Sequence, residues 1–498
     1  MIGLLALKNL VLRPWRTAFL LLGYSLGVGV MIVLLSIGEA LLHQARDERL
    51  VGGGSVTVLP EGIDVEVMKT GGLGGMFFSI DHARFVYRQL LAAPRLASDV
   101  GAAAPQIEEK LLYVRRPGTS TNVEVIASGE LPSRSAAVDA IPPIARGRWE
   151  DDGADREWRD PLADELRQEI DHFHLPPAGV RGDPTWAEWH YFNVLSSDRK
   201  KWYFISYIIA GALPSGGWGG QVLVVTHEQG GATRRFIANV PATAVKFSTS
   251  RADVAIGQSS VTVLADGRYA VRAHALDEHG GSAIDVALVV SPADGAYFPG
   301  SALMSGPTPS GYVVPALRAD ATGSVCIDGR CEQYDHAQSY HDHNWGVWRG
   351  VTWDWGASRA GEYTLLYGRV QSADSSSTSS SLFVYVTDSL GFLAVFRPRD
   401  IKYVDGRTLH VGERTIAVPS AGSMIDVRGD DTLRVDLTIE DATATDTRNA
   451  QAERGQSRAG RDLAKPYFIQ MKGRMRVSGR VAGRAIAGIG SGFFETYR

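Results

Sequence analysis

The sequence predicts a mainly β protein in which two barrel or sandwich domains follow one N-terminal transmembrane helix and a small α+β segment. Short alternating stretches dominate from Trp186 onward, and Asp-Gly pairs at 266–267 and 405–406 separate neighbouring stretches. A single long apolar run lies near the N-terminus. Many short strands without intervening helices are typical of sandwiches and barrels, and Asp-Gly between two strands predicts a hairpin.

Composition bounds the classes of function. The chain has 498 residues, of which 44% are hydrophobic and 21% charged, so it is long enough for several cores. Its net charge of −4 provides no basic surface, which argues against nucleic acid as a partner. The sequence contains no P-loop, and neither a G-x-G-x-x-G nor a G-x-S-x-G elbow between a predicted strand and a helix. We therefore expect neither nucleotide chemistry nor a serine hydrolase, and no cofactor.

The apolar run, Thr17 to Ile37, is uncharged and long enough to span a bilayer as a helix. Because Lys8, Arg13 and Arg16 precede it, the positive-inside rule leaves the N-terminus in the cytoplasm. A cleaved signal peptide is the alternative, but the run exceeds a usual h-region and no A-x-A site follows closely. We expect an uncleaved single-pass anchor over residues 1–42, with the bulk of the chain extracytoplasmic, in the periplasm or at the cell surface.

The rest of the chain divides by pattern. A helix is expected at His82 to Leu91 and a strand at Glu109 to Val114. Leu162, Leu166 and Ile170 recur at four-residue spacing and predict an amphipathic helix. Trp202 to Leu213 is too short and too aromatic for a second membrane helix, and we interpret it as a buried strand. The predicted segments are 43–145 (extracytoplasmic), 146–185 (linker and helix), 186–350 and 351–498 (two β domains), with polar loops at 374–381 and 441–462.

The two cysteines of the chain, Cys326 and Cys331, flank Asp328 and Gly329 in the run VCIDGRC. A small disulfide loop is geometrically plausible there. Two free thiols are the other interpretation, and the choice depends on the compartment.

Ionisable and aromatic side chains are most concentrated in YHDHNWGVW, Tyr340 to Trp348. If this run is a strand, successive side chains fall on opposite faces. Tyr340, Asp342 and Asn344 then share one face, and His341, His343 and Trp345 share the other. A carboxyl surrounded by aromatic rings is suited to proton transfer, because burial raises its pKa.

YHDHNWG resembles the signature of the carotenoid 1,2-hydratase (hydroxyneurosporene synthase) and AttH-like family of lipocalin-like proteins. The resemblance covers about Trp186 to Arg498 and includes WAEWHYF (186–192) and the ending GSGFFETYR (490–498). It implies two lipocalin-like domains and a proton donor in the Tyr-x-Asp pair, which here is Tyr340 and Asp342. The His-x-Trp pair of the hydratases is missing from 311–317, so the resemblance implies a lyase of hydratase or cyclase type without choosing between the two.

From these patterns we expect catalytic roles for Asp342 and Tyr340 and supporting roles for His341 and His343. A metal site is the main alternative to acid catalysis. His-x-His on a strand can supply two metal ligands, and Glu188 and His190 could complete the set. No Glu follows at the spacing of a cupin site, so we expect no metal and assign the two histidines to hydrogen bonds that hold Asp342. The expected substrate-binding residues are Trp345, Trp348, Asn344, Trp186, Glu188 and His190.

The N-terminal part resembles the start of permeases of the MacB and FtsX type of ABC transporter, through residues 56–90. That resemblance implies ABC transporter subunits as partners. Two functions follow as alternatives. The first is acid-initiated protonation of an isoprenoid or polyene, and the second is non-catalytic binding of a lipid or other apolar molecule for an ABC export system.

Overall fold

The computed structural model describes residues 12, 14–46, 80–115, 118, 122–138, 150–153, 155, 170–305, 308–348, 351–371, 382–447, 465–481 and 483–498. Two compact units make up the chain: residues 1–91 with 100–160, and residues 92–99 with 161–498. Most of the expected amphipathic helix, the loop at 374–381 and the domain junction at Gly350 lie outside the described residues.

The first unit contains the apolar helix and a small α+β segment. Helix α2 (Pro14–Arg46) has a window, Pro14–Ile37, with mean hydropathy 2.4, so it is long and apolar enough to cross a membrane, as a membrane anchor or a signal sequence would be. The helix and the strand expected near residues 82–91 and 109–114 are confirmed. The other elements are α4 (Ile80–Ala92), the antiparallel pair β1 (Gln106–Arg115) and β2 (Asn122–Glu130), and α6 (Pro132–Ala137).

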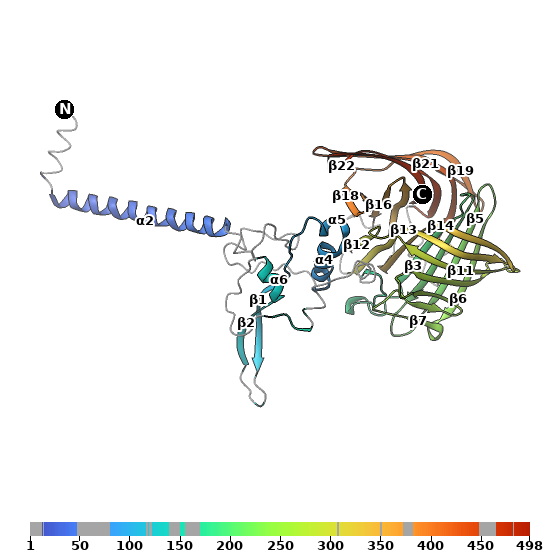
Figure 1. Ribbon diagram of the computed structural model, residues 1–498, viewed down its shortest axis with the longest axis horizontal. Helices are drawn as coiled ribbons and strands as arrows, with labels where there is room; N and C mark the ends of the chain where they lie inside the picture. Colours follow the sequence, from blue (N-terminus) through green and yellow to red (C-terminus); the bar gives the residue numbers. More distant parts are fainter. Residues whose placement is uncertain are drawn as a thin grey trace. The chain divides into compact units, whose positions relative to one another are not determined.

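The second unit opens with the short helix α5 (Pro94–Ala97) and is otherwise built from two antiparallel sheets, so the mainly β fold class is confirmed (Figure 1). The elements of its first sheet and the two 3₁₀ turns before and within it are η2 (Ala178–Val180), β3 (Trp186–Leu195), β4 (Lys201–Gly211), β5 (Trp218–Glu228), β6 (Thr233–Pro241), η3 (Ala242–Ala244), β7 (Val245–Phe247), β8 (Val254–Ile256), β9 (Ser259–Val263), β10 (Tyr269–Asp277), β11 (Ala283–Pro292), β12 (Phe298–Ser305), β13 (Thr308–Ile327) and β14 (Arg330–Val347).

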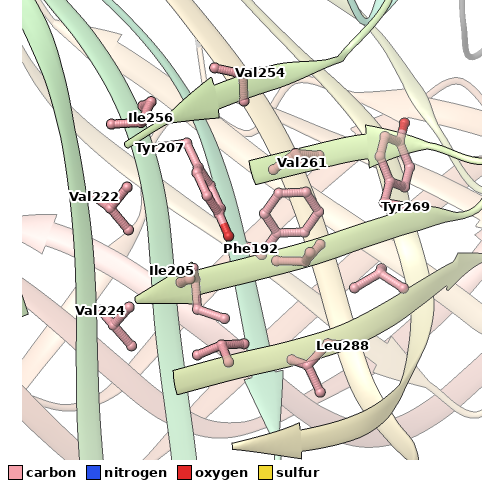
Figure 2. Close-up of a cluster of buried hydrophobic side chains, with 14 of the residues drawn as sticks. Phe192, Ile205, Tyr207, Val222, Val224, Val254, Ile256, Val261, Tyr269 and Leu288 are labelled. Carbon is pink, nitrogen blue, oxygen red and sulfur yellow. The ribbon is translucent and has the colours of Figure 1, made fainter. Parts of the chain in front are cut away.

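The first sheet closes on itself. Strands β11, β13, β14, β3, β4, β5, β6 and β10 pair in that order, and β10 pairs back with β11. We call this ring the first barrel. Its inward-facing residues alternate with outward-facing ones, as strand geometry requires. Figure 2 shows part of the interior, where Phe192, Ile205, Tyr207, Val222 and Leu288 are all buried.

The second sheet has the pairing order β18-β17-β16-β15-β23-β22-β21-β20-β19. Its end strand β18 contacts β20, the second strand from the other end: the backbone N–H of Arg397, just after β18, donates to Asp426 of β20, and Arg428 donates to the carbonyl of Val395. The strands are β15 (Thr352–Ala360), β16 (Tyr363–Gln371), β17 (Phe383–Asp388), β18 (Gly391–Phe396), β19 (Lys402–Val411), β20 (Arg414–Arg428), β21 (Asp431–Asp446), β22 (Tyr467–Val481) and β23 (Arg484–Tyr497).

The two sheets pack through aromatic side chains and a few buried polar bonds. One cluster joins Tyr312 and Tyr340 of the first barrel to Trp355, Phe383 and Tyr385 of the second sheet. At another place His227 Nε2 lies 2.9 Å from Asp441 Oδ2, and Lys472 Nζ donates to the carbonyl of Arg199 at 2.6 Å. The face between the sheets is therefore held in a defined geometry.

One of the two predicted hairpins is confirmed and the other is wrong. Asp266-Gly267 forms the turn between β9 and β10. Asp405-Gly406 instead lies inside β19 at an irregularity of its pairing with β20, and the real turn follows Val411. A bulge uses the same residue types as a turn, which explains the error. The loop expected at 441–462 is also corrected at its start, since 441–446 belong to β21.

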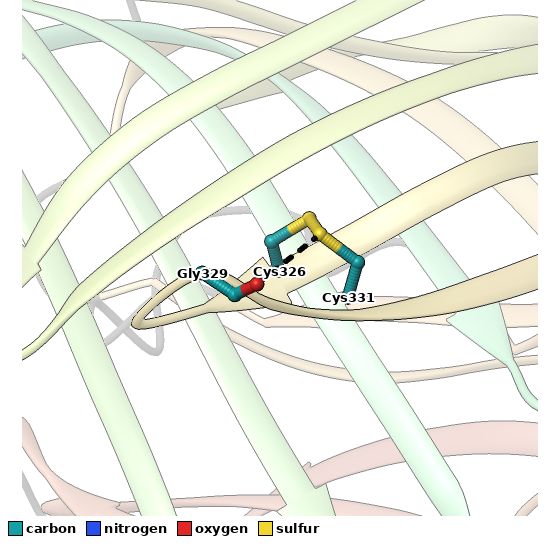
Figure 3. The surroundings of a disulfide bond; sticks show 3 residues. All are labelled: Cys326, Gly329 and Cys331. Carbon is teal, nitrogen blue, oxygen red and sulfur yellow. Dashed lines mark hydrogen bonds between the residues drawn. A yellow bond between two sulfur atoms is a disulfide. The ribbon is translucent and has the colours of Figure 1, made fainter.

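The cysteines form a disulfide between β13 and β14, where Cys326 and Cys331 are directly opposite each other (Figure 3). Asp328 and Gly329, both with positive φ, make the turn that joins the two strands. Positive φ is the backbone conformation that tight hairpin turns need.

Candidate active site

Strand β14 presents the YHDHNWG run between the two sheets, with its faces divided as expected. On β3, Tyr191 is directly opposite Asp342, and His190 is opposite His343. Alternation turns Tyr340 and Asp342 toward the second sheet and turns His341 and His343 into the first barrel. One strand therefore carries two separate polar sites.

A chain of hydrogen bonds leads to Asp342 on the face toward the second sheet. The indole Nε1 of Trp355 donates to the Tyr340 hydroxyl at 2.8 Å. The Tyr340 hydroxyl in turn bonds to Asp342. The Asn344 side chain donates to Asp342 Oδ1 at 2.7 Å. Because an indole only donates, Tyr340 accepts from Trp355 and its own proton is free to point at the carboxyl.

A second carboxyl, Glu495 of β23, lies in the same region. Trp353 Nε1 donates to Glu495 Oε2 at 2.8 Å, and the Tyr191 hydroxyl bonds to the same carboxyl group. Burial, and then the nearby Glu495, raise the pKa of Asp342 to about 8. Burial also raises the pKa of Glu495. A buried carboxyl with a pKa of about 8, as in Asp342, can hold and release a proton near neutral pH.

The barrel face of β14 meets Asp171, a residue from the segment before β3. Asp171 Oδ2 lies 3.1 Å from His341 Nε2 and accepts from the Tyr269 hydroxyl at 2.7 Å. Its Oδ1 lies 2.9 Å from His343 Nδ1. The other nitrogen of His343 is 3.0 Å from Glu188 Oε1. Asp171, His341 and His343 are at most 1% exposed, so this network is sealed inside the barrel.

Burial, hydrogen bonds and neighbouring charges shift the pKa values within that network. Burial by itself lowers the pKa of His343, but its hydrogen bonds to Asp171 and Glu188 raise the pKa to about 9. Burial raises the pKa of Asp171, and the neighbouring His341 and His190 outweigh burial and bring the pKa well below its ordinary value. Burial and His343 bring the pKa of His190 well below the ordinary value.

The predicted site residues therefore fall into two groups. Tyr340, Asp342 and Asn344 lie together, and Trp348 packs with the aromatic cluster on their side of the strand. The others lie on the barrel side: Trp186 and Trp345 pack with the barrel core, while Glu188 and His190 surround His343. Trp345 stacks on His174 with ring centroids 3.8 Å apart. The structure does not bring these four beside Asp342.

Sequence reasoning missed Asp171, Glu495 and Tyr191. The available signals were weak. Asp171 belongs to the run DHFH just before the β region, and Tyr191 and Glu495 lie in two of the stretches that carry the family resemblance. The long separation along the chain hid their convergence, because periodicity predicts which face a side chain takes but not which strand lies opposite.

Comparisons with known proteins give structural likeness only. No family model matches the chain, and no curated protein matches it. Among solved structures, the chain is similar to a putative AttH from Nitrosomonas europaea (15% identity, 66% of this chain and 98% of that one, TM-score 0.44). It is also similar to kievitone hydratase from Nectria haematococca (12%, 66% and 94%, TM-score 0.38) and to CghA (15%, 66% and 94%, TM-score 0.39). The resemblance of the N-terminal part to permeases stays a prediction.

Proposed function

We propose that the protein is an enzyme that protonates a carbon–carbon double bond of a hydrophobic isoprenoid or polyene, with Asp342 as the proton donor. The observation that carries the proposal is the hydrogen-bond chain from Trp355 through Tyr340 to Asp342, enclosed by aromatic side chains between the two sheets. The resemblance of YHDHNWG to the carotenoid 1,2-hydratase signature supports the same reaction class.

The chemistry balances without a cofactor. The carboxyl of Asp342 gives its proton to one alkene carbon, and the neighbouring carbon becomes a cation while the carboxyl becomes a carboxylate. Water then adds to the cation and returns a proton to the carboxylate, which is hydration. Alternatively, a second double bond of the same molecule attacks the cation, and the cyclised cation loses a proton to the carboxylate, which is an isomerisation by cyclisation.

Aromatic side chains favour the cationic intermediate. Trp348 and Trp353 pack beside each other with ring centroids 6.1 Å apart, in the cluster that also contains Tyr340. An indole face within about 6 Å of a cation contributes on the order of 1 to 2 kcal/mol. Tyr340 orients the acid and relays its proton.

The test is to incubate the full chain in detergent with linear isoprenoids and follow the products by mass spectrometry. A gain of one water indicates hydration, and a new isomer of unchanged mass indicates cyclisation. Asp342→Asn is expected to lower product formation by about 100-fold or more, because the donor is lost. Asp335→Asn is the matched control, since Asp335 is on the same strand but exposed.

Product formation that persists undiminished in Asp342→Asn would overturn the assignment of the donor. Non-catalytic binding of an apolar molecule is favoured instead if no isoprenoid is converted and apolar ligands bind equally to the wild type and to Asp342→Asn. The aromatic cluster between the sheets suits that function, since an apolar ligand needs no acid.

We also propose that α2 anchors the protein in a membrane with the β region outside the cytoplasm, with ABC transporter subunits as partners. The length and hydropathy of Pro14–Ile37 support the anchor. Protease added to spheroplasts, from which any outer membrane barrier has been removed, should degrade the β region if it is extracytoplasmic. Protection until the spheroplasts are lysed would contradict this topology.

A further inference from the structure

We propose that Asp171, His190 and His341 bind one divalent transition-metal ion of the zinc class inside the first barrel. This site lies on the opposite face of β14 from Asp342 and goes beyond the function proposed above. From the sequence we expected no metal, because no acid at a fitting spacing follows His341 and His343. Asp171 supplies that acid from 170 residues upstream of His341.

His190 is the observation that points to a ligand. Its side chain is fully buried, yet within the described part of the chain no side chain hydrogen-bonds to either ring nitrogen, and only the backbone of Ala252 lies close to the ring. The nearest carboxylate oxygen, Asp171 Oδ1, is 3.7 Å from Nδ1, which is beyond hydrogen-bonding distance. A buried imidazole without partners is costly, and a metal ion bound to its lone pair would remove that cost.

His341 has the arrangement of a metal ligand. Its Nδ1 faces the backbone carbonyl of Tyr191 at 3.0 Å and so carries a hydrogen there. In the neutral ring Nε2 is then left with its lone pair, and that atom faces Asp171 Oδ2 at 3.1 Å. Two acceptors facing each other need a cation between them, either a proton or a metal ion. Metal-binding histidines commonly donate the remote N–H to a backbone carbonyl in this way.

The spacing of the three donors suits a metal ion. The donor atoms of Asp171, His190 and His341 all lie within 4.8 Å of one another. A tetrahedral ion with bonds of about 2.0 Å has ligand atoms about 3.3 Å apart. His341 Nε2 is 3.1 Å from Asp171 Oδ2 and His190 Nδ1 is 3.7 Å from Asp171 Oδ1, so each histidine lies near that separation from a different oxygen of the carboxylate. Two imidazoles and one carboxylate form a donor set typical of zinc.

Residues around the trio hold it in place. The Tyr269 hydroxyl and His343 Nδ1 bond to the two Asp171 oxygens, and Glu188 holds His343 from its other side. A second group of possible donors, His174, Glu188 and His343, is close by. We do not assign the ion to that group, because it has no member comparable to His190: His174, Glu188 and His343 are all hydrogen-bonded through their side chains, including the pair His174 and Glu188 at 2.9 Å.

The test measures metal binding rather than activity. The full chain is purified in detergent, stripped with a chelator, titrated with Zn²⁺ and Co²⁺, and assayed for bound metal by elemental analysis after gel filtration. One ion per chain, a visible absorption band with Co²⁺ and a higher unfolding temperature with metal are expected. His190→Gln and Asp171→Asn should weaken binding by about 100-fold or more. His274→Gln is the matched control, because His274 also pairs with an aspartate, Asp285, but at an exposed position.

Circular dichroism of each variant establishes that it is folded before binding is compared. A wild-type chain that retains no stoichiometric metal would overturn the proposal, whatever the variants do. Equal binding in wild type and in folded His190→Gln would overturn it as well. Loss of binding in the two site variants, with retention in His274→Gln, supports it.

Discussion

Asp342 and Asp171 are two buried carboxyls on opposite sides of one strand, and they differ in charge. Burial and then the nearby Glu495 raise the pKa of Asp342 to about 8, because its hydrogen-bond donors, Asn344 and Tyr340, are neutral and lower the pKa too little to offset them. Asp171 faces imidazoles, and its pKa is held well below the ordinary value. The comparison shows that burial alone does not decide the charge of a carboxyl. The groups around a buried carboxyl decide whether it is protonated, and can donate a proton, or stays a carboxylate.

The sharpest way to break this comparison is to replace each acid by its amide. Asp171→Asn leaves the buried imidazoles of His341 and His343 without their anion, so a loss of about 3–5 kcal/mol in unfolding free energy is expected. Asp342→Asn keeps neutral polar atoms among neutral donors, and a loss below about 1 kcal/mol is expected. Denaturant unfolding of both variants measures the difference, and equal losses would contradict the distinction.

Removing one hydroxyl tests the face toward the second sheet. Tyr340→Phe deletes the group between Trp355 and Asp342 and leaves the Trp355 N–H without its acceptor. Turnover of the isoprenoid substrate should fall by about 10- to 100-fold, with smaller changes in substrate affinity. Tyr385→Phe is the control, since it removes a hydroxyl from the same aromatic cluster. A similar loss of turnover in both variants would show that Tyr340 has no special role.

Crowding the barrel face tests its packing. A Cβ at Gly311 would overlap the Trp345 ring, so Gly311→Ala must displace Trp345 from its stack on His174. A loss of about 1–3 kcal/mol is expected from overpacking. Gly179→Ala has open space around it and should change stability little. Tryptophan fluorescence follows the displacement, and an unchanged spectrum with unchanged stability would argue against this packing.

A third aspartate–histidine pair, Asp441 with His227, joins the two sheets at a partly exposed position. Burial raises the pKa of Asp441, but the bond to His227 outweighs burial and the pKa is lowered below 3.8. The carboxylate therefore stabilises the fold above the ordinary pKa, and this contribution is lost as pH falls through the lowered value. Asp441→Asn should cost about 1–2 kcal/mol at neutral pH, and the difference should vanish in strong acid. A difference that is independent of pH would contradict the ionic contribution.

The sequence by itself determined the local features of this protein. The alternation in YHDHNWG placed Tyr340, Asp342 and Asn344 on one face and His341 and His343 on the other, and the apolar run at 17–37 predicted helix α2. These features depend on neighbouring residues only, through the two-residue period of a strand and the length of an uninterrupted apolar run.

Only the tertiary structure decided which residues meet across those faces. Asp171 reaches His341 and His343, and Trp355 bonds to Tyr340, because the barrel closes and the sheets pack in one register. The same reason explains why Asp405-Gly406 is a bulge within β19 and not a turn. Contacts between distant segments depend on strand pairing and core packing over the whole domain, and no local pattern in the sequence encodes them.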